Sequence, residues 1–208
     1  MSPRTAPTGV TAAMRQWASW LLCACMLAAL PGGGAQALDA ESIYEAYVLN
    51  FVRYSRWPDS DSGNGDYVIA VIGPSAIAAD LRRLAERNGP VQGHALRVRA
   101  IALNTLAPVR REAVRTLQAT LDDARVVFVA PSHRSWNGAV IAATAGKPVL
   151  TVGIGGDFVR QGGMLALFDH QGRVNFCANE AAIKQSSVDV SARVMVLART
   201  APTSLDEE

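Results

Sequence analysis

Short and nearly continuous apolar runs, separated by segments with helical periodicity, constrain the fold of this chain more than any other feature. The runs occupy residues 67–72, 125–130 and 148–152. Apolar residues at successive positions, rather than at alternate ones, are typical of strands buried on both faces of a parallel sheet. A fourth strand is predicted at 95–102, and helices are predicted at 75–87, 108–122 and 135–145. Strands that alternate with helices predict an α/β fold, with a mostly parallel sheet covered on both sides.

A helix is also predicted at residues 39–57, before the first strand. Its aromatic and apolar residues recur at three- and four-residue spacing, and they are Ile43, Tyr47, Phe51, Tyr54 and Trp57. Asp39 can cap the first turn, while Pro58 ends the helix and residues 59–65 form a polar loop.

The last part of the chain has a different pattern. Residues 164–168 and 173–177 flank a polar turn at 169–172, which predicts an antiparallel hairpin. A helical tail is expected to follow, with an apolar stripe formed by Ile183, Val190, Val194 and Leu197. We therefore predict a single-domain, three-layer α/β sandwich over residues 38–200, with a disordered tail at 201–208.

The first 37 residues contain no Asp or Glu and have the three parts of a secretory signal. Arg4 and Arg15 precede an apolar run at 17–30, and Ala35-Gln36-Ala37 supplies a small-residue cleavage site. The run is 14 residues long, whereas a helix needs about 20 residues to cross a bilayer. The sequence therefore predicts a signal peptide over residues 1–37 that is cleaved near Ala37.

Two other interpretations of this segment stay open. The apolar run can be retained as a membrane anchor. Alternatively, Cys25 can carry a lipid, because Leu22-Cys23-Ala24-Cys25 loosely matches a lipoprotein cleavage box. The start of translation is also open between Met1 and Met14.

Removal of the signal peptide changes the charge and the cysteine count. The whole chain has 20 Lys and Arg against 18 Asp and Glu, and cleavage removes Arg4 and Arg15, so the mature domain is neutral. It also removes two of the three cysteines and leaves Cys177, so no internal disulfide can form. A neutral domain argues against nucleic-acid binding, which depends on a basic surface.

The ends of the predicted parallel strands, where α/β folds usually bind ligands, carry no complete catalytic motif. Gly153 and Gly155 begin a dinucleotide fingerprint, but Phe158 occupies the third glycine position, so a tight surface turn is the simpler interpretation. Ser132 and His133 lack the glycines of a nucleophile elbow, and adjacent residues do not by themselves form a nucleophile–base pair. Capping or hydrogen bonding within that loop is the expected role.

Metal and cofactor sites are not expected either. His94, His133 and His170 lie in three separate loops and Cys177 lies in a predicted strand, and no pair of them has the spacing of metal ligands. No complete phosphate-binding loop sequence is present. We therefore predict no cofactor, no metal and no enzymatic activity.

Three groups of residues occur in a distinctive order. The first is an aromatic-Trp-Pro step that comprises Tyr47, Phe51, Tyr54, Trp57 and Pro58. The second runs through residues 148–152, Phe158, Gly162-Gly163-Met164, residues 172–176 and Asn179. The third is Val196-Leu197-Ala198-Arg199. With these groups in this order and spacing, the chain resembles the YfiR-type (HmsC-like) family of periplasmic proteins from about residue 40 to residue 199.

The resemblance implies a periplasmic regulator. Proteins of this family bind the periplasmic domain of an inner-membrane diguanylate cyclase and hold the enzyme inactive, which limits cyclic di-GMP and biofilm formation. The mature protein would therefore lie in the periplasm without spanning the membrane, and a homodimer is left open. Some relatives are thought to sense redox state through disulfides, but Cys177 alone cannot supply such a switch.

In the resemblance, contact with the cyclase lies in the C-terminal region. The candidate partner-binding residues are Phe168, Phe176, Asn179, Ile183 and Lys184. Arg53, Arg56 and Trp136 are weaker candidates, because surface Arg and Trp are suited to interfaces. The residues expected in the core are Tyr47, Phe51, Trp57 and Met164.

A second hypothesis is a periplasmic receptor for a small molecule. Its pocket would be lined by two strand-end loops, at residues 132–136 and 153–157. A pocket between those loops would support this hypothesis, and a flat surface there would remove it.

Overall fold

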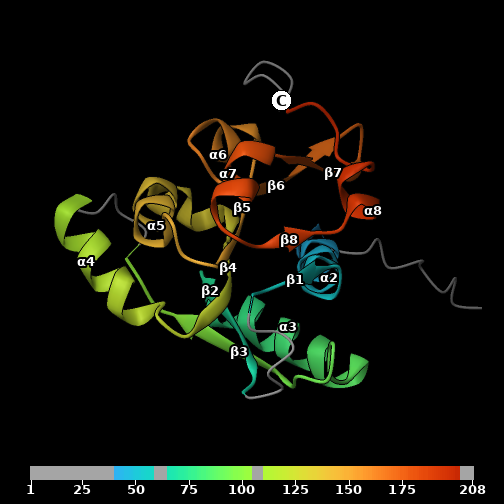
Figure 1. The fold of residues 1–208 in the computed structure, drawn as a ribbon, viewed down its shortest axis with the longest axis horizontal. Coiled ribbons are helices and arrows are strands. Elements are labelled where there is room, and N and C mark those ends of the chain that lie inside the picture. The colour runs from blue at the N-terminus through green and yellow to red at the C-terminus, as the bar shows by residue number, and fades with distance from the viewer. Residues whose placement is uncertain (1–39, 59–64, 105–109, 202–208) are drawn as a thin grey trace, which may run out of the picture. The chain divides into compact units, whose positions relative to one another are not determined.

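The computed structural model describes residues 40–58, 65–104 and 110–201, all of which belong to the compact unit Leu38–Glu208 (Figure 1). A six-stranded sheet forms its centre, in the spatial order β3-β2-β4-β5-β6-β7. In chain order the strands are β2 (Tyr67–Ile72), β3 (Leu96–Ile101), β4 (Ala124–Val129), β5 (Leu150–Ile154), β6 (Leu165–His170) and β7 (Arg173–Ala178). Strands β2 to β6 run parallel to one another, and β7 alone runs antiparallel, beside β6.

Helices cover both faces of this sheet. One face packs against α2 (Ala40–Arg53), α3 (Ser75–Asn88) and the short C-terminal helices α7 (Glu180–Gln185) and α8 (Ala192–Met195). The other face packs against α4 (Arg110–Thr120), the 3-10 helix η3 (Pro131–Trp136), α5 (Asn137–Thr144) and α6 (Gly156–Arg160). The predicted three-layer α/β sandwich, with a mostly parallel sheet and an antiparallel C-terminal hairpin, is confirmed.

Strand β2 shows why its residues are apolar at every position. All six are buried, and their side chains alternate between the two layers. Ile69 and Val71 pack towards α2 and α3, whereas Ala70 and Ile72 pack towards α4 and α5. A central strand with helices on both sides has no solvent-facing position, so a polar residue at any of them would be buried.

The first helix ends earlier than predicted. Helix α2 stops at Arg53, and residues 55 and 56 form strand β1 (Ser55–Arg56), which pairs with strand β8 (Asp189–Val190). Gln92 accounts for the early end, because its side-chain amide donates to the carbonyl oxygens of Arg53 (3.2 Å) and Ser55 (2.8 Å). The predicted cap Asp39 and residues 59–64 of the predicted loop lie outside the described residues.

The predicted helical tail is wrong. In its place are α7, β8 and α8, separated by Ser187 in the left-handed region (φ 60°) and by Ser191, whose hydroxyl accepts from the backbone N–H of Arg193. Of the predicted stripe, Ile183, Val190 and Val194 are buried, and Leu197 is exposed. The apolar spacing was compatible with one helix, but the pairing of β8 with β1 interrupts it.

Other predicted boundaries shift by a few residues. Helical structure before the predicted helix 135–145 begins already at Pro131, as η3, and α5 then runs to Thr144. Strand β5 spans Leu150–Ile154 instead of 148–152. The predicted helix start at Pro108 lies outside the described residues.

The hairpin forms through a two-residue turn. His170 pairs with Arg173, and Gln171 and Gly172 between them both have positive φ, at 55° and 70°. This is the backbone conformation that matches the twist of the flanking strands. The Asp169 carboxylate accepts from the Gly172 backbone N–H at 3.0 Å and closes the turn.

Hydrogen bonds from other parts of the chain occupy carbonyl oxygens at both edges of the sheet. At the β3 edge, Arg82 donates to the carbonyl oxygen of Val98 at 3.0 Å. At the β7 edge, the Tyr47 hydroxyl donates to the carbonyl oxygen of Val174, and the Arg199 backbone N–H donates to that of Phe176. An edge whose carbonyls are occupied is a poor template for the addition of another strand.

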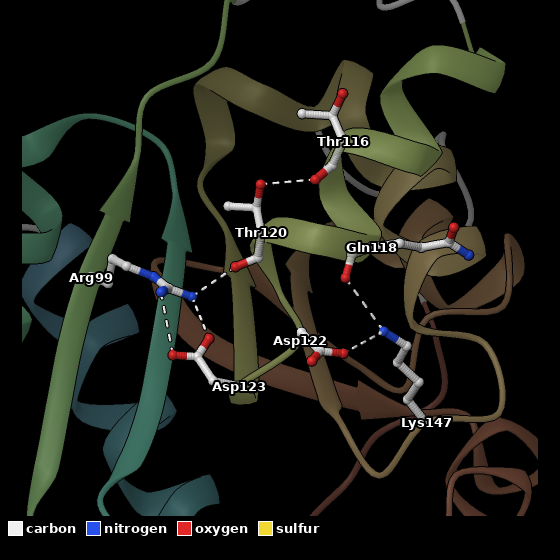
Figure 2. A network of polar contacts seen from close by, with 7 residues as sticks. All are labelled: Arg99, Thr116, Gln118, Thr120, Asp122, Asp123 and Lys147. Carbon is white, nitrogen blue, oxygen red and sulfur yellow. Dashed lines mark hydrogen bonds and ion pairs between the residues drawn. The ribbon is translucent and has the colours of Figure 1, made fainter.

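Two cations hold the C-terminal end of α4 against the sheet (Figure 2). Arg99, on β3, donates to the carbonyl oxygen of Thr120 at 2.7 Å and to the Asp123 carboxylate at 2.6 Å. Lys147 donates to the carbonyl oxygen of Gln118 and to Asp122, at 3.4 and 3.5 Å. Positive side chains here neutralise the negative end of the helix dipole and occupy its last carbonyls.

Candidate functional site

The strand order places a reversal between β2 and β4, the position at which open α/β sheets bind ligands. The backbones approach closely at this point. A Cβ on Gly73 would lie 2.5 Å from the Cβ of Ala130, and the Ala130 backbone N–H donates to the carbonyl oxygen of Ile72 at 2.9 Å. Residue 73 therefore has to be glycine, because Ala130 leaves no room for a side chain there.

Ser132 and His133 lie in η3, directly after this approach. The Nε2 of His133 lies 3.2 Å from the carbonyl oxygen of Leu103, which can only accept, so Nε2 carries the hydrogen. In the neutral imidazole with this tautomer, Nδ1 accepts from the Ser132 hydroxyl at 2.9 Å. This hydrogen bond between adjacent residues lies within the 3-10 helix and agrees with the hydrogen-bonding role expected for this loop.

The hydrogen bonds of η3 tie it to the segment after β3. Besides His133, Trp136 donates from its indole nitrogen to the carbonyl oxygen of Asn104 at 2.6 Å. Both side chains are buried. They join two loops at the carboxyl edge of the sheet, which is the hydrogen-bonding role expected for His133. Trp136 is thus packed inside the molecule rather than on the surface expected of an interface residue.

The glycines at 153–156 do not form a surface turn, and this prediction is wrong. Gly153 and Ile154 belong to β5, Gly155 has φ 86°, and Gly156 begins α6; all four are buried. The ring of Phe158 lies directly against Gly153, where a Cβ would come within 2.4 Å of it. A phosphate group would have to occupy the volume of that ring, so this segment is not a nucleotide cradle.

Within residues 40–58, 65–104 and 110–201, no three His, Cys, Asp or Glu side chains gather closely enough to hold a metal ion. The three histidines lie in different places. His94 stacks on Tyr67 with ring centroids 4.2 Å apart, His133 lies in η3, and His170 is exposed at the hairpin. Cys177 is buried in β7, and its thiol points towards the carbonyl oxygen of Ala166 at 3.7 Å.

Three of the five candidate partner-binding residues are buried in this chain. Phe168 packs on the α4–α5 side of the sheet, and Phe176 packs on the α2 side, where its ring centroid lies 5.1 Å from that of Phe51. Ile183 points inwards from α7. The antiparallel pairing of β6 with β7 places the two phenylalanines on opposite faces, so they do not form one patch.

The other two candidates lie at the start and on the outside of α7. Asn179 caps the helix, because its side-chain Oδ1 accepts from the Ala182 backbone N–H at 3.0 Å. Its side-chain Nδ2 donates to the carbonyl oxygen of Val159 at 3.1 Å. Lys184 is exposed and lies 3.5 Å from Glu180. Of the five residues, Lys184 is the one whose side chain is largely open to solvent.

The weaker candidates Arg53 and Arg56 lie together beside a hollow of about 380 Å³. The hollow is lined by Arg53, Tyr54, Arg56, Gln92, Asp189, Ser191 and Ala192. It forms where β1 and β8 cross the end of α2. This hollow is not predictable from the sequence, because strands of two residues leave no periodic signal.

A second hollow, of about 220 Å³, lies between the end of α5, the start of β5 and α7. Its hydroxyls are already engaged: Thr144 donates to the carbonyl oxygen of Val140, Thr151 accepts from Met164, and Ser186 donates to Ile183. Neither of these two hollows is lined by residues 132–136 or 153–157, which were expected to line the pocket of a small-molecule receptor.

Comparison with known families identifies the chain. The model of the family DUF4154, described as YfiR/HmsC-like, matches residues 41–199. The chain belongs to this YfiR/HmsC-like family. The matched range runs from the start of α2 to the residue that covers the β7 edge, so it includes the whole described sandwich.

No curated protein matches the chain. Among solved structures, a conserved domain protein from Vibrio cholerae O1 biovar El Tor strain N16961 is similar, with 16 % sequence identity and a TM-score of 0.47. The match covers 74 % of this chain and 58 % of that protein, so the chain spans less than two thirds of its length. Within the part of the chain that the structure describes, no helix is both long and apolar enough to cross a membrane.

Proposed function

We propose that this YfiR/HmsC-like protein is a periplasmic negative regulator that binds the periplasmic domain of an inner-membrane diguanylate cyclase. Binding keeps the cyclase inactive, lowers cyclic di-GMP and limits biofilm formation. The observation that carries the proposal is the family match across residues 41–199, which includes every described helix and strand except the first residue of α2. The structure supports it through a sandwich whose two helix layers are packed on the sheet across the matched residues.

A regulator that binds the periplasmic domain inhibits the cyclase by shifting the equilibrium between its active and inactive states. A regulator shifts the equilibrium only by the difference between its affinities for the inactive and the active state. To change an equal mixture into one that is about 99 % inactive, it must bind the inactive state roughly 100-fold more tightly. A preformed and well-packed surface suits this task, because little ordering entropy is lost on binding.

The partner surface is proposed to include the hairpin and α7. Lys184 would contact the cyclase directly, since its side chain is exposed. The contribution of the buried candidates Phe168, Phe176 and Ile183 would be indirect, because their packing fixes the positions of β6, β7 and α7. Asn179 would contribute by capping α7. Lys184→Glu would then weaken repression, whereas substitutions of the buried residues would weaken it through loss of fold.

The decisive experiment is a deletion of the gene with cyclic di-GMP measured in cell extracts. The proposal expects a rise in cyclic di-GMP and in attached biomass, both reversed when the full chain is supplied in trans. The control is a deletion strain that also lacks the cyclase activity, in which no rise should occur. An unchanged cyclic di-GMP level in the single deletion would exclude the proposed function.

Export is proposed to depend on residues 1–37. Mass spectrometry of the protein recovered from the periplasmic fraction should give a mature N-terminus at residue 38, after Ala37. A chain that keeps the apolar run, or one that begins at a lipid-modified Cys25, would instead identify an anchored form.

A further inference from the structure

We propose that the surface around β1 and β8 docks a segment of the cyclase's periplasmic domain that carries carboxylates beside apolar side chains. This β1–β8 surface comprises Arg53, Tyr54, Arg56, Arg193, Val196 and Leu197. The inference rests on the proposed function, and it adds a contact site and a partner chemistry that the hairpin and α7 do not supply.

The apolar part of this surface is unusual for the molecule. Among the described residues, the large hydrophobic side chains that are exposed are those of Tyr54 (42 %), Val196 (83 %) and Leu197 (69 %). All three flank the β1–β8 pair: Tyr54 directly precedes β1, and Val196 and Leu197 directly follow α8. Large apolar side chains that gather at one place on a surface commonly mark a binding site.

Backbone contacts hold these residues in one place. The Ser191 backbone N–H donates to the carbonyl oxygen of Tyr54 at 2.9 Å, which fixes the start of α8 beside the end of α2. Val196 lies four residues after Ala192, one helical turn along, so it shares a helix face with a residue that lines the 380 Å³ hollow. Tyr54 and Val196 therefore adjoin the hollow that Arg53 and Arg56 line, and Leu197 is the next residue in the chain.

The arginines of this surface form no ion pair with any described residue. Arg53 donates to the neutral amide of Asn88 at 3.2 Å. Arg56 lies opposite Asp189 in the strand pair, but no ion pair closes between them, and Arg193 of α8 has none either. By contrast, Arg99 and Lys147 at the end of α4 each bind a carboxylate (Figure 2).

The charges that line the hollow favour an acidic partner segment. Two guanidinium groups, those of Arg53 and Arg56, line the hollow, and Asp189 is the one carboxylate among its described lining residues, so the charge of this lining is positive although residues 38–208 are neutral in sum. Guanidinium groups bind carboxylates through two parallel hydrogen bonds, and Arg with Tyr is the composition of an interface hot spot. An acidic segment with apolar side chains matches both parts of this surface, and it would also accelerate association.

The test uses three variants of the full chain in the deletion strain: Arg56→Ala, Leu197→Ser and the matched control Arg134→Ala. Arg134 is an exposed arginine in η3, at the other side of the sheet. Arg56 and Leu197 make no packing contact in the core, so all three variants should fold and reach the periplasm in equal amounts. Circular dichroism of the purified proteins and immunoblots of periplasmic fractions check this.

If the β1–β8 surface binds the cyclase, Arg56→Ala and Leu197→Ser raise cyclic di-GMP towards the level of the deletion, and Arg134→Ala stays at the wild-type level. The partner cyclase is the one whose loss prevents the rise in cyclic di-GMP in the deletion strain. Each surface variant should bind the purified periplasmic domain of that cyclase with a Kd at least tenfold higher than that of the wild-type chain. An Asp or Glu to Arg substitution in that domain should strengthen binding to Arg56→Glu while it weakens binding to the wild-type chain.

Two results separate this inference from the proposed function. A rise in cyclic di-GMP on deletion together with wild-type behaviour of both surface variants would leave the function intact and overturn the β1–β8 surface. Alternatively, free glutamate or citrate could raise the melting temperature of the wild-type chain but not that of a surface variant, while the variant still represses the cyclase. This result would assign the hollow to a small carboxylate and would also overturn the inference. No rise on deletion would remove the proposed function, and the inference with it.

Discussion

The ring of Phe158 packs directly on the backbone of Gly153. A Cβ at residue 153 would lie 2.4 Å from Cγ and Cδ2 of that ring, and a Cβ at Gly163 would lie 2.2 Å from its Cε1. Phe158 is fully buried between these two glycines, which brings α6 against β5 and the start of β6. Gly153, the first glycine of the apparent dinucleotide fingerprint, is thus required by an aromatic side chain of the same chain.

Gly153→Ala should destabilise the fold by about 2 kcal/mol or more, because the new methyl group has to displace a buried ring. Urea unfolding, followed by circular dichroism, measures the change. Gly138→Ala is the matched control: nothing lies within 4 Å of a Cβ there, and it should be neutral or slightly stabilising in helix α5. Equal stabilities of the two variants would contradict the packing described for Phe158.

Phe176→Ala and Lys184→Ala should separate a structural role from a surface role in the C-terminal region. Phe176 is buried against Phe51 and Tyr47, so its truncation should cost about 3–5 kcal/mol of unfolding free energy. Lys184 has an exposed contact with Glu180, and its truncation should change stability by less than about 0.5 kcal/mol. A stable Phe176→Ala protein would show that the ring is not part of the core.

Arg99→Met should lower stability by about 1 kcal/mol, since it removes a hydrogen bond to the Thr120 carbonyl oxygen and an ion pair with Asp123. The Arg99 side chain is 40 % exposed, so part of the loss should be screened in 1 M NaCl. Thermal unfolding at low and high salt measures both effects. Arg56→Met, at an arginine without such contacts, should leave the melting temperature unchanged.

Cys177 should react with thiol reagents only after unfolding. The residue is 1 % exposed and lies in β7, where its backbone pairs with Arg199 of the terminal segment. A chromogenic disulfide reagent should therefore label the folded protein many times more slowly than the protein in 6 M guanidinium. Rapid labelling under native conditions would mean that the terminal segment opens from the β7 edge.

The agreement between sequence and structure is best where burial is two-sided or a turn is short. Strand β2 is predicted to the residue, because each of its positions faces a helix layer and none tolerates a polar side chain. The hairpin is also predicted, since Asp169 and Gly172 carry the residue types that its turn needs. Both predictions depend on residues within a single short segment, and the tertiary structure keeps both elements.

Agreement fails where distant segments meet. Helix α2 ends at Arg53 because Gln92, 39 residues away in the chain, binds the carbonyl oxygen there, and residues 55 and 56 pair with 189 and 190. The same pairing divides the predicted helical tail into α7, β8 and α8. Apolar spacing within a segment cannot report such contacts, because they depend on which segment the fold brings alongside.

Local residue patterns were sufficient to predict the α/β class, the parallel sheet with its terminal hairpin, and the residues of the family signature. Those features follow from local burial patterns, which each strand or helix carries in its own residues. Tertiary structure alone decided which of the candidate residues face solvent. It buried Phe168, Phe176 and Ile183, filled the glycine loop with Phe158, and left Arg56, Val196 and Leu197 on the surface around β1 and β8. Exposure depends on the packing of segments that are distant in the chain, so no local pattern of residues encodes it.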